Sequence, residues 1–211
     1  MNLKTILIDD HEVVRKGLRQ IIIDEFPQAD IMEAGSAEEA IKIIRKEKFD
    51  MVISDISMSG RSGIDLVKQL HDELPALPVL ILSMHNENQY AMRVMKAGAS
   101  GYLTKDSASL ELIKAIKIII SGRKYISPAV AQLLAQSFSV NHAQSIHDAL
   151  SDREFEVLKL IGTGKSVSEI GDELSLGVTT ISTYRSRILD KMKLQTNADI
   201  IRYVIENNLL K

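Results

Sequence analysis

The sequence predicts two domains: an α/β domain with a doubly wound, five-stranded parallel sheet, and after it a small all-α domain. Two observations carry this prediction. Up to Gly122, short and almost uninterrupted apolar runs alternate with stretches of helical periodicity, which is typical of parallel strands that helices bury on both faces. From Leu150 onward only helical periodicity remains, which is typical of a small helical module.

Each element of the first domain has its own signal in the sequence. The short runs that predict strands lie at residues 6–8, 51–54, 79–82 and 102–104, and a further strand is expected at 30–33 between the first two helices. Apolar residues recur at helical spacing over 12–26, 36–47, 63–74, 86–97 and 109–121. Ser36 and Glu39 have the spacing of a capping box, which predicts the start of the second helix. We expect this domain to span residues 1–122.

The segment that follows predicts a linker. Ser127 and Pro128 are typical of a helix start, and a short helix is expected over 129–136. The stretch 137–147 is polar and aperiodic, so residues 123–148 as a whole are interpreted as a linker with one short helix. The last domain is then expected over 149–211.

Within that last domain, three helices are predicted in a row. The first starts at Ser151, the second carries apolar residues from Val167 to Leu174, and the third runs over 178–192. Leu176 and Gly177 form a short turn between the second and third. Two short helices joined by such a turn predict a helix-turn-helix.

Composition limits the possible functions. The 211 residues carry a net charge of −2, which excludes a strongly basic nucleic-acid binder, so any DNA contact must come from a local patch. Cysteine is absent, which excludes disulfides and thiolate metal sites and favours a cytoplasmic location. No apolar run approaches the ~20 residues that span a bilayer, and the N-terminus lacks the apolar region of a signal peptide. We therefore expect no membrane partner.

Polar residues stand just after four of the five predicted strands of the first domain. They are Asp9, Asp10, Asp55, Ser83 and Lys105. Since the carboxyl ends of parallel strands share one edge of the sheet, where ligands bind, these side chains are expected to form one pocket. A lone Asp at a strand end is most often a helix cap and a lone Lys a solvated surface residue, but five such residues in this order favour a site.

The residue types in this pocket point to phosphoryl chemistry. Three neighbouring carboxylates are costly unless a cation neutralises them, and oxygen ligands suit Mg²⁺ or Mn²⁺. A carboxylate beside such a metal can attack a phosphoryl group. Asp55 is the candidate nucleophile, Asp9 and Asp10 are candidate metal ligands, and Lys105 and Ser83 are candidates to bind the phosphoryl oxygens.

These motifs resemble the receiver domain of bacterial two-component response regulators, a flavodoxin-like fold. The matching segments are Ile8-Asp9-Asp10-His11, Ser54-Asp55-Ile56-Ser57-Met58, Leu82-Ser83 and Gly101-Tyr102-Leu103-Thr104-Lys105. The resemblance implies that Asp55 accepts a phosphoryl group from a histidine kinase. It also implies that Asp9, Asp10, Asp55 and the backbone carbonyl of Ser57 bind Mg²⁺, and that Ser83 and Tyr102 report phosphorylation to the surface. Ser59 stands where that family usually has Pro.

The last domain resembles the LuxR-type helix-turn-helix of the NarL/FixJ branch of response regulators. The segments that carry this resemblance are Leu150-Ser151-Asp152-Arg153-Glu154-Phe155-Glu156-Val157-Leu158, Gly164-Lys165-Ser166, Glu169-Ile170-Gly171 and Thr180-Ile181-Ser182-Thr183-Tyr184-Arg185-Ser186. Tyr184 stands where the family usually has His. The resemblance implies that the third helix of this domain enters DNA.

Helical periodicity divides that third helix into two sides. One apolar stripe is expected to be buried and consists of Val178, Ile181, Ile188, Leu189 and Met192. The other side is expected to face DNA and consists of Thr179, Ser182, Thr183, Ser186 and Arg187, which we call the reading face. Phosphate contacts are expected from Lys165, Thr180, Arg187 and Lys191. Arg185 falls near the buried stripe, where a structural ion pair and a DNA contact remain alternatives.

Together these observations predict a phosphorylation-activated, DNA-binding transcription regulator that is not an enzyme. Its expected partners are a histidine kinase, double-stranded promoter DNA with an inverted repeat, and a second copy of the chain when phosphorylated. One rival is a phosphohydrolase with an aspartyl nucleophile. Haloacid-dehalogenase-type enzymes have a second Asp two residues after the nucleophile, and this chain has Ser57 there, which argues against that rival. The other rival is a protein-binding adaptor whose helical module never contacts DNA.

Overall fold

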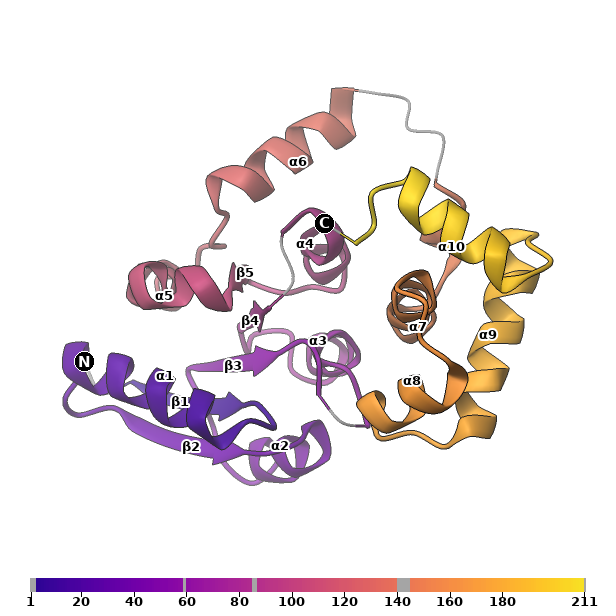
Figure 1. The fold of residues 1–211 in the computed structure, drawn as a ribbon. Helices are drawn as coiled ribbons and strands as arrows, with labels where there is room; N and C mark the ends of the chain where they lie inside the picture. Colours follow the sequence, from indigo (N-terminus) through magenta and orange to yellow (C-terminus); the bar gives the residue numbers. More distant parts are fainter. Residues whose placement is uncertain (1–2, 59, 85–86, 140–144, 211) are drawn as a thin grey trace. The chain divides into compact units, whose positions relative to one another are not determined.

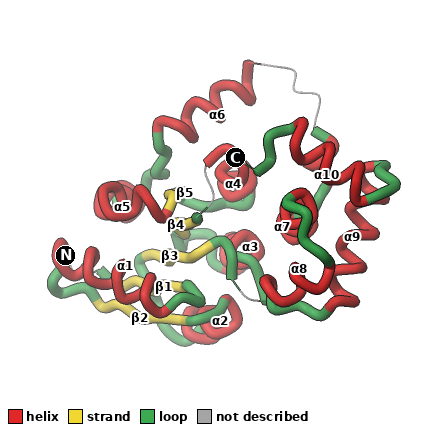
Figure 2. Tube along the Cα trace, viewed as in Figure 1, coloured by secondary structure: helices red, strands yellow, loops and turns green. Residues whose placement is uncertain are grey.

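The computed structural model describes residues 3–58, 60–84, 87–139 and 145–210. The chain forms two compact units, residues 1–138 and 139–211, which are described separately below (Figures 1 and 2). Ser59, which departs from the receiver pattern, lies outside the described residues, as do residues 140–144 of the predicted linker. Among the described residues, no helix is both long and apolar enough to cross a membrane.

The first unit contains the predicted five-stranded sheet, and all its strands are parallel. The strands are β1 (Lys4–Ile8), β2 (Asp30–Ala34), β3 (Met51–Asp55), β4 (Val79–Ser83) and β5 (Gly101–Thr104). Their order is β2-β1-β3-β4-β5. Because β1 lies between β2 and β3, the winding of the sheet reverses there, and ligands of such sheets bind at the strand ends beside this point.

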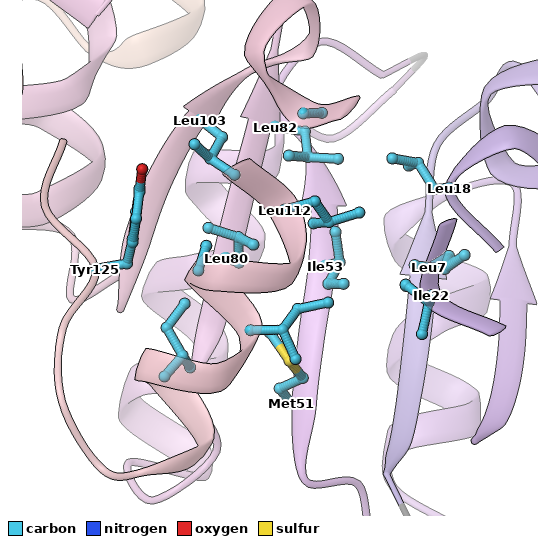
Figure 3. Packing of buried hydrophobic residues seen from close by; sticks show 14 of the residues in the cluster. Leu7, Leu18, Ile22, Met51, Ile53, Leu80, Leu82, Leu103, Leu112 and Tyr125 are labelled. Atoms are coloured by element: carbon cyan, nitrogen blue, oxygen red, sulfur yellow. The ribbon is translucent and has the colours of Figure 1, made fainter. Parts of the chain in front are cut away.

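Helices cover both faces of the sheet (Figure 1). They are α1 (Glu12–Glu25), α2 (Ala37–Ile44), α3 (Gly63–Glu73), α4 (Glu87–Lys96) and α5 (Lys105–Ile120). One apolar core forms where α1 and α5 lie on the strands. Figure 3 shows Leu112 of α5 with Leu80 and Ile53, and Ile22 of α1 beside Leu7. This core positions the strands, and with them the residues that follow the carboxyl end of each strand.

Helix α5 begins four residues earlier than the sequence analysis predicts. The hydroxyl of Thr104 accepts a hydrogen bond from the amide of Ser107 at 3.3 Å and caps the helix. Lys105 is therefore the first helical residue, directly after β5. The spacing of Thr104 and Ser107 carried the signal for this cap.

The predicted capping box of α2 is only half formed. The Ser36 hydroxyl accepts from the amide of Glu39 at 3.2 Å, as expected. The Glu39 carboxylate, however, accepts from the amide of Gly35 at 2.8 Å and not from that of Ser36. The helix start is nevertheless fixed at the predicted residue, because the hydroxyl alone satisfies one of the free amides of the first turn.

Past α5, the chain remains attached to the sheet. The amide of Tyr125 donates to the carbonyl of Ser100 at 2.8 Å, and Tyr125 forms a parallel bridge with Gly101. Helix α6 (Pro128–Ser139) follows, with Pro128 at its first position as predicted. The compact first unit extends through this helix almost to its end.

The second unit is all helical. It contains the short 3-10 helix η1 (Ile146–Ala149) and helices α7 (Asp152–Gly162), α8 (Val167–Leu174), α9 (Val178–Met192) and α10 (Asn197–Glu206). Helix α7 packs against both α9 and α10. The sequence analysis named no separate helix at α10, although Thr196 and Asp199 form a capping box there. The α8–turn–α9 arrangement is the predicted helix-turn-helix.

Candidate phosphoacceptor pocket and nucleic-acid interface

The carboxyl ends of three strands bring an acidic pair and a lysine together. Asp9 follows β1, Asp55 ends β3, and Lys105 follows β5. The Lys105 ammonium lies 2.7 Å from Oδ2 of Asp9 and 3.1 Å from Oδ2 of Asp55. Both carboxylates are almost fully buried, at 2% and 4% exposure. The structure thus joins three of the predicted pocket residues by direct contacts.

Asp10 and His11 complete the acidic side of the pocket. One ligand atom from each of Asp9, Asp10, His11 and Asp55 lies within 4.8 Å of the others. His11 was not among the predicted pocket residues, although it follows the acidic pair directly. Its Nδ1 lies 2.9 Å from Oδ1 of Asp10 and 3.1 Å from Oδ1 of Asp9. Three carboxylates within this span suit a hard divalent cation such as Mg²⁺, which prefers oxygen ligands.

Burial changes the protonation of the proposed nucleophile. Removal from water raises the pKa of Asp55 to about 6, and the charge of Asp9 adds to this shift, while Lys105 acts against it. Burial by itself would lower the pKa of Lys105, but Asp55 and Asp9 hold it above its ordinary value. Lys105 therefore remains a cation. A second cation beside Asp55 would lower the pKa of Asp55 and favour the carboxylate form of this residue.

Two residues outside the predicted set fix the backbone around the carboxylates. Arg15 donates to the carbonyl oxygen of Asp9 at 2.5 Å and to the Glu33 carboxylate at 3.1 Å. At Gly63, a Cβ atom would lie only 2.1 Å from the carbonyl oxygen of Asp55. A side chain at this position would therefore displace the nucleophile's strand end. The need for glycine arises from the contact between the start of α3 and the end of β3, so the local sequence does not reveal it.

Ser83 and Tyr102 lie on neighbouring strands of the same edge. Ser83 is the last residue of β4 and pairs in register with Thr104, while Tyr102 pairs with Ile81. Both side chains are buried. Ser57, whose carbonyl the receiver resemblance implicates in metal binding, lies two residues past Asp55 and is half-buried.

In the second unit, all five residues of the reading face are exposed on α9. Burial of the apolar stripe begins at Ile181 and includes Ile188 and Met192. The prediction for Val178 was wrong, because its side chain is 53% exposed. Val178 is the first residue of the helix, one turn before the stripe becomes covered. Leu189, also predicted to be buried, is only half-buried. The prediction is confirmed for Ile181, Ile188 and Met192.

The residues predicted to contact phosphates differ in their surroundings. Arg187 and Thr180 are exposed. Lys165 forms an ion pair with Glu173, and the ammonium of Lys191 lies 2.6 Å from Oε2 of Glu154. The Nε of Arg185 donates to the side-chain oxygen of Asn197 at 2.5 Å, so its partner in this contact is a neutral amide and not a carboxylate. A DNA contact of Arg185 stays a prediction.

Comparisons with known proteins agree with this geometry. The family described as response regulator receiver domain matches residues 5–117, and the family described as bacterial regulatory proteins, luxR family, matches residues 148–204. The response regulator UvrY of Escherichia coli is 33% identical over 208 residues, which cover 98% of this chain and 95% of UvrY. The response regulator GacA of Pseudomonas aeruginosa is 31% identical over 209 residues, covering 99% of this chain and 98% of GacA.

A solved structure is similar over the whole chain. It contains two RcsB dimers bound to two parallel DNAs, and it is 25% identical to this chain with a TM-score of 0.60. The similarity covers 100% of both chains. The fold of this chain is therefore similar to that of RcsB over both of its units.

Proposed function

This chain belongs to the two-component response regulators that join a receiver domain to a LuxR-type DNA-binding domain, and we propose that phosphorylation of Asp55 controls its binding to promoter DNA. The receiver domain is assigned to residues 1–122, the linker with its helix to 123–148 and the DNA-binding domain to 149–211. Since its proposed ligand is promoter DNA, its place of action is the bacterial cytoplasm.

The proposed phosphoryl transfer starts from the phosphohistidine of a sensor kinase. An Oδ atom of Asp55 attacks the phosphorus, the P–N bond of the phosphohistidine breaks, and the freed imidazole nitrogen takes a proton from water. Asp9, Asp10, Asp55 and the carbonyl of Ser57 would hold Mg²⁺, which supplies charge neutralisation for the transferred oxygens. Lys105 exchanges its contact with Asp55 for one with the phosphoryl oxygens.

Ser83 and Tyr102 are proposed to carry the change away from the pocket. The hydroxyl of Ser83 can donate to a phosphoryl oxygen once Asp55 is modified. Ser83 is a buried residue on β4, which lies between β3 and β5. Tyr102 lies on β5, so a shift of this end of β4 would displace its buried ring. Movement of that ring would alter the surface on which two receivers meet.

Helix α9 is proposed to enter the major groove with its reading face. Thr180 and Arg187 are the proposed phosphate contacts with freely exposed side chains, and Lys165 and Lys191 would join them only by giving up their carboxylate partners. So few contacts make one module weak, because affinity depends heavily on phosphate neutralisation. Two modules on adjacent half-sites double the contacts and make the second one effectively intramolecular.

We therefore expect a phosphorylated homodimer on an inverted repeat with half-site centres about one helical turn apart. The binding of RcsB to DNA as dimers supports the homodimer in this proposal. The match of residues 148–204 to the luxR family of bacterial regulatory proteins favours DNA binding over the adaptor alternative.

One observation carries the proposal: Lys105 lies between two buried carboxylates at the switch point of the sheet. The test is a gel shift of full-length protein with genomic fragments, with and without acetyl phosphate and Mg²⁺. The expected result is a shift that acetyl phosphate strengthens in wild type and leaves unchanged in Asp55→Asn. Equal strengthening of both proteins would contradict the proposal.

A further inference from the structure

The hydroxyl of Thr183, at the centre of the reading face, is already used within α9. Its Oγ1 donates to the backbone carbonyl of Thr179, one helical turn earlier, at 2.9 Å. A threonine hydroxyl has one proton, so Thr183 cannot donate to a base unless this bond breaks. The side chain is exposed, and what it offers to a ligand is its methyl group together with an oxygen that can only accept.

A hollow of about 230 Å³ lies beside Thr183 on the surface of α9. Three threonines, one tyrosine and one arginine line it: Thr179, Thr180, Thr183, Tyr184 and Arg187. Tyr184 stands where the LuxR-type helix-turn-helix usually has His, so this part of the wall departs from the family pattern. The hollow is large enough to admit a group the size of a methyl.

Only one group of this kind projects into the major groove of DNA. Thymine carries a C5-methyl group there, and apolar contacts such as that of a threonine methyl distinguish it from cytosine and from the purines. Among the five residues of the reading face, only Arg187 has a side chain suited to bidentate hydrogen bonding with guanine. The other four side chains of the reading face are short threonines and serines, and the threonines can contact a methyl group of a base.

We propose that Thr183 is a specificity-determining residue that recognises the C5-methyl group of a thymine in each half-site. This inference rests on the proposed binding of α9 to DNA and names the base chemistry that it selects. We therefore expect the affinity for DNA to fall by a similar factor when a methyl group is removed from the DNA and when it is removed from Thr183. The two removals are not additive, because each one abolishes the same contact.

The probe is a pool of random 24-base-pair duplexes enriched with phosphorylated full-length wild-type protein. The enriched pool is then copied once with dTTP and once with dUTP, which gives the same sequences with and without the thymine methyl. The dissociation constants of both pools are measured at one salt concentration for wild type and for variants treated with acetyl phosphate.

Wild type should bind the dUTP copy more weakly by about fourfold for each lost methyl contact, or about 15-fold for a dimer on two half-sites. Thr183→Ser retains the hydroxyl and should bind both copies equally, near the weaker value. Thr183→Val retains the methyl and should still prefer the dTTP copy. Thr163→Ser is the matched control, because Thr163 is exposed on the surface and makes the same kind of bond, to the carbonyl of Leu160; it should behave as wild type.

Two results would overturn the inference. One is equal binding of both copies by wild type, and the other is unchanged discrimination in Thr183→Ser. If Thr183→Val lost its affinity while Thr183→Ser kept it, the hydroxyl would be accepting from a base amino group and the methyl assignment would be wrong. A failure of wild type to bind any pool would instead contradict the proposed DNA binding, and so the two failures are distinct.

Discussion

The ammonium nitrogen of Lys105 lies 2.7 Å from Oδ2 of Asp9, although 96 positions separate the two residues in the sequence. The same nitrogen lies 3.1 Å from Asp55. One cation therefore offsets two buried carboxylates that would otherwise repel each other across the ends of β1 and β3. Changes to any of the three charges should have separable effects on metal binding, phosphorylation and stability.

Asp55→Asn should abolish phosphorylation, because the amide oxygen is a far poorer nucleophile than the carboxylate. With Mg²⁺ and acetyl phosphate, wild type is expected to gain the mass of one phosphoryl group and the variant none. Intact mass spectrometry measures this directly. Asp24→Asn, an exposed position on α1, is the control and should be labelled like wild type. Labelling of Asp55→Asn at the wild-type level would refute the assignment of the nucleophile.

Asp10→Ala should lose the dependence of phosphorylation on Mg²⁺, since one of the three clustered carboxylates is removed. The variant should label at the slow rate that wild type shows in the presence of EDTA. Titration with Mg²⁺ while following the labelling rate distinguishes the two proteins. Wild-type rates in Asp10→Ala at saturating Mg²⁺ would mean that the metal binds elsewhere.

Lys105→Ala should retain Mg²⁺ binding but lose the assembly change that follows phosphorylation, because the phosphoryl oxygens lose their fixed cation. At 100 times the dissociation constant a bound metal adds about 2.7 kcal/mol of stability. Because the variant retains Mg²⁺ binding, Mg²⁺ should raise its melting temperature as it raises that of wild type. Calorimetry and gel filtration measure the two properties, with the exposed Lys46→Ala as control. An unaltered assembly change in Lys105→Ala would argue against its role.

The second unit has its own ion pair with a pH dependence. Burial raises the pKa of Glu154, but the Lys191 ammonium and the Ser151 amide outweigh burial and hold it below its ordinary value of 4.5. The carboxylate therefore stabilises the fold above pH 4.5, and this stability is lost as the pH falls through the lowered pKa. Glu154→Gln should cost about 1–2 kcal/mol at pH 7, and the difference from wild type should disappear toward pH 3.

Thermal unfolding followed by circular dichroism at both pH values measures this effect. Glu206→Gln, an exposed residue at the end of α10, is the matched control with little expected change. A difference between Glu154→Gln and wild type that stays constant from pH 7 to pH 3 would show that the charge is not responsible.

The receiver pocket could be predicted from sequence because its geometry follows from topology. Once the apolar runs are assigned to parallel strands, the residues after them must meet at one edge, so Asp9, Asp55 and Lys105 needed no knowledge of packing. The burial pattern of α9 was predictable for the same kind of reason, since helical periodicity fixes which side faces the core.

The features that were missed depend on contacts between distant elements. The pairing of Lys191 with Glu154 joins residues 37 positions apart, and nothing in either local sequence indicates it. The exposure of Val178 depends on how far the neighbouring helices cover α9. The earlier start of α5 did have a local signal in Thr104 and Ser107, but the apolar periodicity that begins later in the helix concealed it.

Phosphorylation of Asp55 is proposed to raise DNA affinity by forming a dimer. The most direct test combines analytical ultracentrifugation with the dissociation constant for one enriched duplex, measured for wild type and Asp55→Asn with and without acetyl phosphate and Mg²⁺. We expect wild type to change from monomer to dimer and to bind DNA at least about tenfold more tightly, and we expect Asp55→Asn to change in neither respect. Tighter binding by a phosphorylated protein that remains monomeric on DNA would contradict this proposal.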